Sequence, residues 1–217
     1  MPELTPSSLR PARQRRSRRS LERIIEALDA LIEEKTFEEI TVTEVCKRAE
    51  VGVGTFYDRV GNKEALLEHL RQRLYAETID QVEQAFAPAR FEGMSLAETL
   101  TVNAKEMVAL HLARQGAMRA LIVEARRSAA FAAHARELNT VLMAKVSAVW
   151  LAKRAEFRPA PSPHVLARSA FLMATGFLRE AMIWDDLWPG ETEVEQLGVD
   201  LHHLLHSFLL SPVQTPS

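Results

Sequence analysis

The chain has 217 residues, of which 47% are hydrophobic and 26% are charged, and its formal net charge is −2. This composition suffices for a packed core, while a single cysteine, Cys46, excludes an internal disulfide. No apolar run approaches the roughly 18 residues of a membrane span, and no apolar stretch follows the basic N-terminus as in a signal peptide. We therefore expect a cytoplasmic protein without a membrane partner.

The charge is distributed unevenly along the chain. Residues 1–20 contain six arginines and one glutamate, a net charge of +5, so the other 197 residues carry −7. A basic segment on an acidic body is typical of a tail that binds a polyanion, although a solvated tail that only aids solubility has the same composition. Because the first dozen residues are rich in Pro and Ser, we assign 1–17 to a disordered Arg-rich arm.

Helical patterns follow this arm. A first helix begins near Ser17 or Ser20, either of which can cap it, and apolar residues recur in it every three to four positions. Two short helices come next, joined by a turn over 50–54, and the second reads "VGTFYDRV". Asn62 caps a long fourth helix. The pattern therefore predicts four helices before Pro88.

The remainder of the chain also has a helical period. Five further helices are predicted over 95–113, 116–127, 128–157, 162–184 and 194–208. No segment shows the alternation of a half-buried strand. The sequence thus predicts an all-α fold with about nine helices.

The two short helices are the first indication of function. An isolated helix needs roughly 12–15 residues to be even marginally stable in water, so their neighbours must support them. The second can then lie at the surface and enter a DNA major groove, which admits one α-helix. Phe56 should point inward as its anchor, while Thr55, Tyr57 and Arg59 face outward.

A longer motif surrounds these helices. It comprises Thr41-Val42, Val45-Cys46, Ala49-Glu50-Val51-Gly52, Gly54-Thr55-Phe56-Tyr57, Val60, Asn62-Lys63-Glu64 and Leu66. In this order and spacing it resembles the N-terminal domain of the TetR family of transcriptional regulators. The resemblance covers about residues 18–78 and implies a helix-turn-helix DNA-binding domain there. It further implies an effector-binding and dimerisation domain over 79–211, before a disordered tail over 212–217.

The resemblance also implies partners and contact residues. It implies a homodimer formed by the last two helices, most simply a repressor released from a palindromic operator by a small-molecule effector. The DNA-binding candidates, taken from the arm and from the motif positions, are Arg15, Arg16, Arg18, Arg19, Thr41, Thr43, Val53, Gly54, Thr55, Tyr57, Arg59 and Lys63. The effector-binding candidates are Met107, His111, Arg119, Ile122, Met143, Phe171, Phe177 and Trp184. Ala167, Ala170 and Ala174 are expected to supply small surfaces to the dimer seam.

The sequence departs from the family pattern in the segment expected to contact DNA, which comprises the two short helices and the turn between them. Glu50 occupies the turn position where the family has Gly, Gly52 replaces the usual Ser cap, and Val60 replaces Phe. Residues 21–63 also carry a net charge of −4, which lacks the basic face typical of DNA-binding domains. An alternative therefore stays open, in which the chain is an interaction protein of this fold with a degenerate DNA reader.

Other chemistry has weaker support. Cys46 occupies a position where the family has a small buried residue, so we expect a packed thiol rather than a redox sensor. His202, His203 and His206 have the helical spacing of metal ligands, but the apolar stripe of their helix points elsewhere. Motifs of nucleophilic, phosphate-binding or zinc-protease sites are not found. We expect neither an enzyme nor a bound cofactor or metal.

Overall fold

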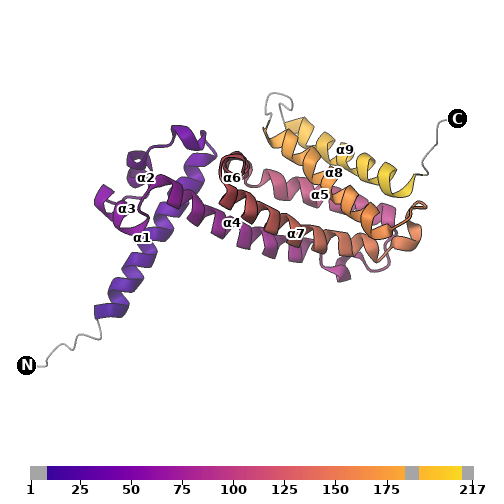
Figure 1. The fold of residues 1–217 in the computed structure, drawn as a ribbon, viewed down its shortest axis with the longest axis horizontal. Helices are drawn as coiled ribbons and strands as arrows, with labels where there is room; N and C mark the ends of the chain where they lie inside the picture. Colours follow the sequence, from indigo (N-terminus) through magenta and orange to yellow (C-terminus); the bar gives the residue numbers. More distant parts are fainter. Residues whose placement is uncertain (1–8, 184–190, 212–217) are drawn as a thin grey trace, which may run out of the picture. The chain divides into compact units, whose positions relative to one another are not determined.

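The computed structural model describes residues 9–183 and 191–211, and within these ranges the regular secondary structure is entirely helical (Figure 1). The α-helices of this part are α1 (Leu9–Ile32), α2 (Val42–Arg48), α3 (Val53–Arg59), α4 (Lys63–Ala85), α5 (Leu96–Leu112), α6 (Gln115–Arg127), α7 (Ala129–Leu151), α8 (Pro163–Ile183) and α9 (Glu191–Leu210). Three short 3₁₀ turns, η1 (Phe37–Glu39), η2 (Pro88–Phe91) and η3 (Arg154–Glu156), lie between them. The predicted all-α fold class is confirmed.

The first helix starts earlier than the sequence predicted. α1 begins at Leu9, so residues 9–17, which we had assigned to a disordered arm, form its first turns. The reason is local, because arginine and alanine are good helix formers and Pro11 lies in the first turn, where proline is tolerated. Residues 1–8 and the expected tail over 212–217 lie outside the described residues.

The chain divides into two compact units. The first unit comprises Met1–Leu74 and Gly116–Leu121, and the second comprises Tyr75–Gln115 and Ile122–Ser217. The boundary predicted at 78/79 lies within α4, and the contacts change from one unit to the other within the same helix. The start of α6 belongs to the first unit, which no sequence pattern predicted.

In the first unit, α1 packs against both short helices, α2 and α3, which also contact each other. Leu28 of α1, Val45 of α2 and Phe56 of α3 are buried, as is Leu66 at the start of α4. Phe56 is therefore the inward anchor that the sequence predicted. Neither seven-residue helix would be stable alone, so this shared core holds them in place.

The start of α6 is fixed to the first unit by one carboxylate. Glu33, just after α1, accepts hydrogen bonds from the amides of Gly116 (2.9 Å) and Ala117 (3.1 Å). These amides lie at a helix N-terminus, where they have no partner within the helix. A Cβ atom on Gly116 would lie 2.2 Å from the carbonyl oxygen of Ile32, so only glycine fits there.

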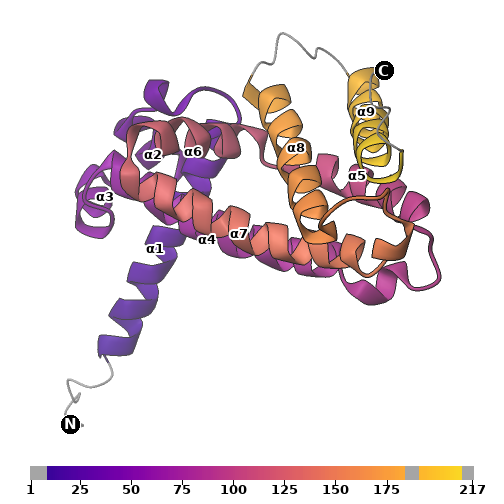
Figure 2. The ribbon, with the colours of Figure 1, turned by 45° about the vertical axis from the view of Figure 1, so that its right-hand side comes forward.

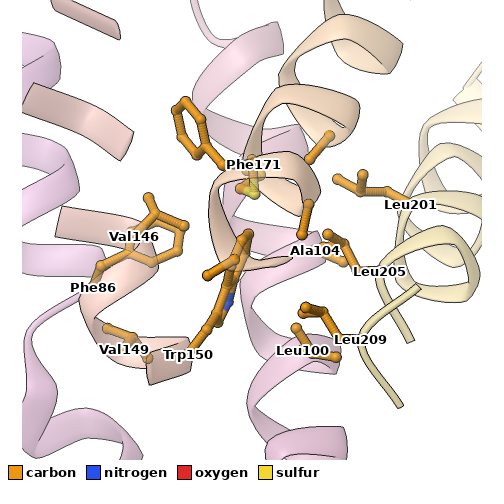
Figure 3. Packing of buried hydrophobic residues seen from close by; sticks show 14 of the residues in the cluster. Phe86, Leu100, Ala104, Val146, Val149, Trp150, Phe171, Leu201, Leu205 and Leu209 are labelled. Atoms are coloured by element: carbon orange, nitrogen blue, oxygen red, sulfur yellow. The ribbon is translucent and has the colours of Figure 1, made fainter. Parts of the chain in front are cut away.

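The second unit is built around one large apolar core. α5 packs against α9 and α8, and α8 also packs against α7 and α9 (Figure 2). The indole of Trp150 is fully buried among side chains such as Phe171 and Leu205 (Figure 3), and its Nε1 donates to Oδ1 of Asn103 at 2.7 Å. This bond satisfies the only polar atom of the indole inside the core.

The same core corrects one expectation about the dimer seam. Ala167, Ala170 and Ala174 on α8 have no exposed surface within the single subunit. They pack inside the subunit's own core and cannot supply the small surfaces that the sequence analysis assigned to a partner. A stripe of alanines shows that a neighbour lies close, but not which neighbour it is.

Candidate nucleic-acid interface

The start of α2 is locked by a reciprocal capping box. The amide of Glu44 donates to Oγ1 of Thr41 (3.3 Å), while the amide and hydroxyl of Thr41 donate to the Glu44 carboxylate. Lys35 also donates to this carboxylate (2.5 Å). The hydrogen bond from Lys35, followed by those from Thr41, lowers the pKa of Glu44 to about 2. The predicted contact residue Thr41 is thus already committed to fixing the helix.

The turn between α2 and α3 contains the unusual Glu50. Its φ of 50° is left-handed, as its place in the motif suggested. The amides of Glu50 and Val51 donate to the carbonyls of Lys47 and Cys46, which is the Schellman pattern at the end of α2. Nη2 of Arg23 donates both to the Glu50 carbonyl (3.1 Å) and to its carboxylate (3.0 Å). An α1 arginine therefore holds a turn that glycine usually makes.

The exposed face of α3 differs from the one that the sequence predicted. Phe56 and Val60 are buried, and Thr55 is only partly exposed. The exposed positions of the helix are Val53, Gly54, Tyr57, Asp58 and Arg59. Asp58, which was not among the predicted contact residues, is therefore part of the accessible face. Its neighbours Tyr57 and Arg59 are exposed as expected.

Cations near the two short helices differ in whether a carboxylate already pairs with them. Lys35, Arg48 and Arg23 are paired with Glu44, Glu34 and Glu50, respectively. Arg18 and Arg19 on α1, Lys47 on α2 and Arg59 on α3 are exposed, and in the described part of the chain they form no hydrogen bond or ion pair. These four can neutralise a phosphate without first losing a partner among the described residues.

Lys47 was missed by the sequence analysis. It lies four residues after Thr43, so the two side chains share one exposed face of α2. The exposure of Lys47 could have been predicted from the sequence, because Val45, Cys46 and Ala49 mark the opposite, buried face of the helix. The side chains of Arg15 and Arg16 lie outside the described residues.

Lys63, a predicted phosphate contact, begins α4. Its Nζ donates to the carbonyl oxygen of Glu38 (3.1 Å) and lies 4.5 Å from the centroid of the Phe37 ring. Burial lowers its pKa. Contact with DNA therefore requires the ammonium to exchange or share these partners, and its role as a phosphate contact stays a prediction.

The predicted effector residues are distributed over both units. Met107 and Phe171 are buried in the core of the second unit, and Met143 and Phe177 pack against it. Nδ1 of His111 lies 2.7 Å from the carbonyl of Met107, and burial lowers the pKa of this imidazole. Arg119 and Ile122 lie on α6 at the boundary, since Arg119 belongs to the first unit and Ile122 to the second. Trp184 lies outside the described residues.

Two further candidates are the histidines of α9 and the single cysteine. His202, His203 and His206 lie together on α9, but no three potential metal ligands gather anywhere in the described ranges. Cys46 is buried, and burial raises the pKa of its thiol, which fits a packed side chain. Among the helices whose residues are described, none is long and apolar enough to cross a membrane.

Known proteins share both the motif and the fold. The model of the family "Bacterial regulatory proteins, tetR family" matches residues 24–70. An uncharacterised helix-turn-helix-type transcriptional regulator of Bacillus subtilis (strain 168), YxbF, is 36% identical over 76 residues. The match covers 35% of this chain and only 20% of that protein.

Solved structures agree over most of the chain. A chain of Mesorhizobium loti MAFF303099, named as a TetR-family transcriptional regulator, has a TM-score of 0.71 at 19% identity, covering 89% of this chain and 96% of its own. The fatty acid degradation regulator FadR of Bacillus halodurans has a TM-score of 0.64 at 21% identity, covering 86% and 94%. These likenesses show the fold. The segment 24–70, which the family model matches, contains α2, α3 and the turn between them. Residues 24–70 thus match the DNA-binding segment of the tetR family of bacterial regulatory proteins, and the chain has the fold of solved TetR-family regulators.

Proposed function

We propose that the protein is a dimeric transcriptional regulator that represses from a palindromic operator and is released by a small-molecule effector. The observation that carries the proposal is the unit of α2, turn and α3. Its reading helix is anchored by Phe56 and exposed on the opposite side. The departure at Glu50 does not break this unit, because Arg23 holds the left-handed turn. A helix held in this manner can enter a major groove.

Dimerisation is supported by the surface of the last two helices. Val165, Leu172 and Met173 on α8 and Val194 and Val199 on α9 are large apolar side chains with 38–54% of their surface exposed. α8 and α9 lie against each other, so two copies can pair them into a four-helix bundle. Such a symmetric contact presents two reading helices to the two halves of a palindrome.

The second unit is proposed to bind the effector. It contains most of the predicted effector residues, on α5, α7 and α8. A protein of similar fold, FadR of Bacillus subtilis, was solved in complex with stearoyl-CoA, with a TM-score of 0.62 at 20% identity, covering 87% of this chain and 98% of its own. That likeness supports a ligand-binding role for this unit without naming the ligand.

The test is binding to the DNA upstream of the protein's own gene. Fluorescence anisotropy at several salt concentrations should show tighter binding to this DNA than to a scrambled duplex. If Arg18 and Arg19 each neutralise a phosphate, changing both to Ala should lower the log–log salt slope by about 1.8, at roughly 0.9 per contact. Lys63→Ala should lower it by about 0.9 for both duplexes.

The matched control removes two arginines from the second unit. Arg126 and Arg136 are exposed on α6 and α7, and their double Ala variant should keep the wild-type slope. Equal affinity of the wild type for both duplexes at every salt concentration would contradict the proposal. It would favour the alternative of an interaction protein with a degenerate reader.

A further inference from the structure

The outward face of α3 is centred on a carboxylate. Asp58 lies two residues after Phe56 and two before Val60, and both of these are buried. At about 100° per residue, Asp58 is therefore roughly 160° around the helix axis from each anchor. Phe56 and Val60 fix the inward direction, so Asp58 points almost directly away from the core.

The position before Asp58 on this face has no side chain. Gly54 lies one turn earlier, and a Cβ atom built on it would meet no atom within 4 Å. Neither packing nor a left-handed backbone thus requires glycine here. A bare backbone beside Asp58 lets a base pair approach the carboxylate closely.

Asp58 also differs from the neighbouring carboxylates in having no partner in the described ranges. The neighbouring carboxylates lie at the end of α1, in η1, in α2 and in the turn. Those that have hydrogen bonds or ion pairs within the chain are Glu33, Glu34, Glu39, Glu44 and Glu50. Glu38 also takes part in an interaction within the chain. Asp58 forms no hydrogen bond or ion pair to any described residue.

A carboxylate at the centre of a reading face restricts what can lie against it. Phosphates repel it, and the major-groove edge of guanine presents only acceptors, N7 and O6, as does O4 of thymine. A buried carboxylate without a donor loses its hydration without compensation. The donors available in the groove are exocyclic amino groups, and N4 of cytosine is the usual partner of an acidic side chain.

We propose that Asp58 is a specificity-determining residue that accepts a hydrogen bond from N4 of one cytosine in each operator half-site. This rests on the proposed DNA-binding function and extends it to the sequence that is read. The same charge opposes binding to sequences that lack a donor at this position. An acidic reading face thereby lowers non-specific affinity and raises the specificity ratio, on which recognition in a genome depends.

The experiment is selection of binding sites from random duplex DNA by the full-length protein. The wild type should select a cytosine at one position of each half-site. Asp58→Ala should lose the preference at that position alone, with discrimination there reduced about 10- to 100-fold. Asp58→Asn should shift the preference toward adenine, because an amide side chain pairs with N6 and N7 of that base. Both variants should bind random DNA more tightly.

Glu26→Gln is the matched control. It removes one exposed charge from α1 of the same unit, and Glu26 also has no partner among the described residues. This variant should select the wild-type consensus. If Glu26→Gln raises affinity for random DNA as much as Asp58→Ala does, and the selected sites are unchanged in both, net charge explains the effect and the inference is wrong.

Two other outcomes separate this inference from the proposed function. A wild-type consensus that Asp58→Ala reproduces at every position, with equal melting temperatures, would overturn the role of Asp58 and leave the regulator intact. Failure of the wild type to enrich any sequence would overturn both.

Discussion

The first unit holds its two short helices by a shared apolar core and by polar contacts at their ends, whereas the second buries long helices in one large apolar core. α2 and α3 have seven residues each and depend on the Thr41–Glu44 capping box and on Arg23 at the turn. α5, α7, α8 and α9 have 17 to 23 residues and surround Trp150.

This difference follows from what each unit has to leave accessible. A reading helix must keep its outer face free, so it can be held only from its inner face and its two ends. Long helices that bury a whole apolar stripe depend less on such contacts, since packing supplies most of their stability. The first unit consequently needs polar contacts because one surface of its short helix must stay exposed. Each of these contacts can be removed separately.

The largest expected effect is in the second unit. Trp150→Ala should lower the free energy of unfolding by about 3–5 kcal/mol, because it opens a cavity and leaves Asn103 without its donor. Urea unfolding followed by circular dichroism measures the change. Glu137→Ala, at an exposed position of the same helix, should stay within about 0.5 kcal/mol of wild type. Similar values for the two variants would contradict a core centred on Trp150.

The next effect concerns the attachment of α6 to the first unit. Gly116→Ala should destabilise the protein by about 1–3 kcal/mol, because the new Cβ atom would overlap the Ile32 carbonyl. Hydrogen exchange of the amides at 116 and 117 should accelerate. Glu33→Gln keeps one neutral acceptor for these amides and should cost less, below about 1 kcal/mol. Unchanged exchange in Gly116→Ala would show that this contact does not hold the helix.

A smaller effect is expected at the turn, where two contributions oppose each other. Glu50→Gly relieves a left-handed non-glycine residue, worth on the order of 1 kcal/mol, but it removes the ion pair with Arg23. That pair is exposed and is worth about 0.2–1 kcal/mol, so the net change should be small. In an Arg23→Ala background, Glu50→Gly should stabilise more than it does in the wild type. A double-mutant cycle with no coupling would contradict the clamp.

The smallest effect is a pH dependence at the start of α2. The folded pKa of Glu44, about 2, lies below its usual 4.5, so its stabilising contribution is present above pH 4.5. It is lost as the pH falls from about 4.5 toward 2, because protonation then breaks the hydrogen bonds from Lys35 and Thr41. The melting temperature should fall less steeply in this window for Glu44→Gln than for wild type. Glu26→Gln, which removes a carboxylate that has no partner in the part of the chain the structure describes, should retain the wild-type steepness.

Several features of the reading unit could be predicted from the sequence because their causes are local. Phe56 was placed inward by its position in a short periodic segment, and the left-handed conformation of Glu50 was suggested by its place in the motif. The outward direction of Asp58 was also available, since Phe56 and Val60 four residues apart define the opposite face. It was missed because only Thr55, Tyr57 and Arg59 were assigned to the outward face.

What the sequence by itself determined is the helical class, the order of the helices and the family to which the reading unit belongs, because periodicity and short motifs act within a few residues. Tertiary structure alone decided which surfaces meet. Glu33 caps a helix that begins more than 80 residues later, and no local pattern records this pairing. Ala170 faces the core of its own subunit, while Leu172 remains exposed on the same helix. An apolar stripe requires a partner surface, but only the packed chain shows which surface that is, since burial against any complementary apolar surface is favourable.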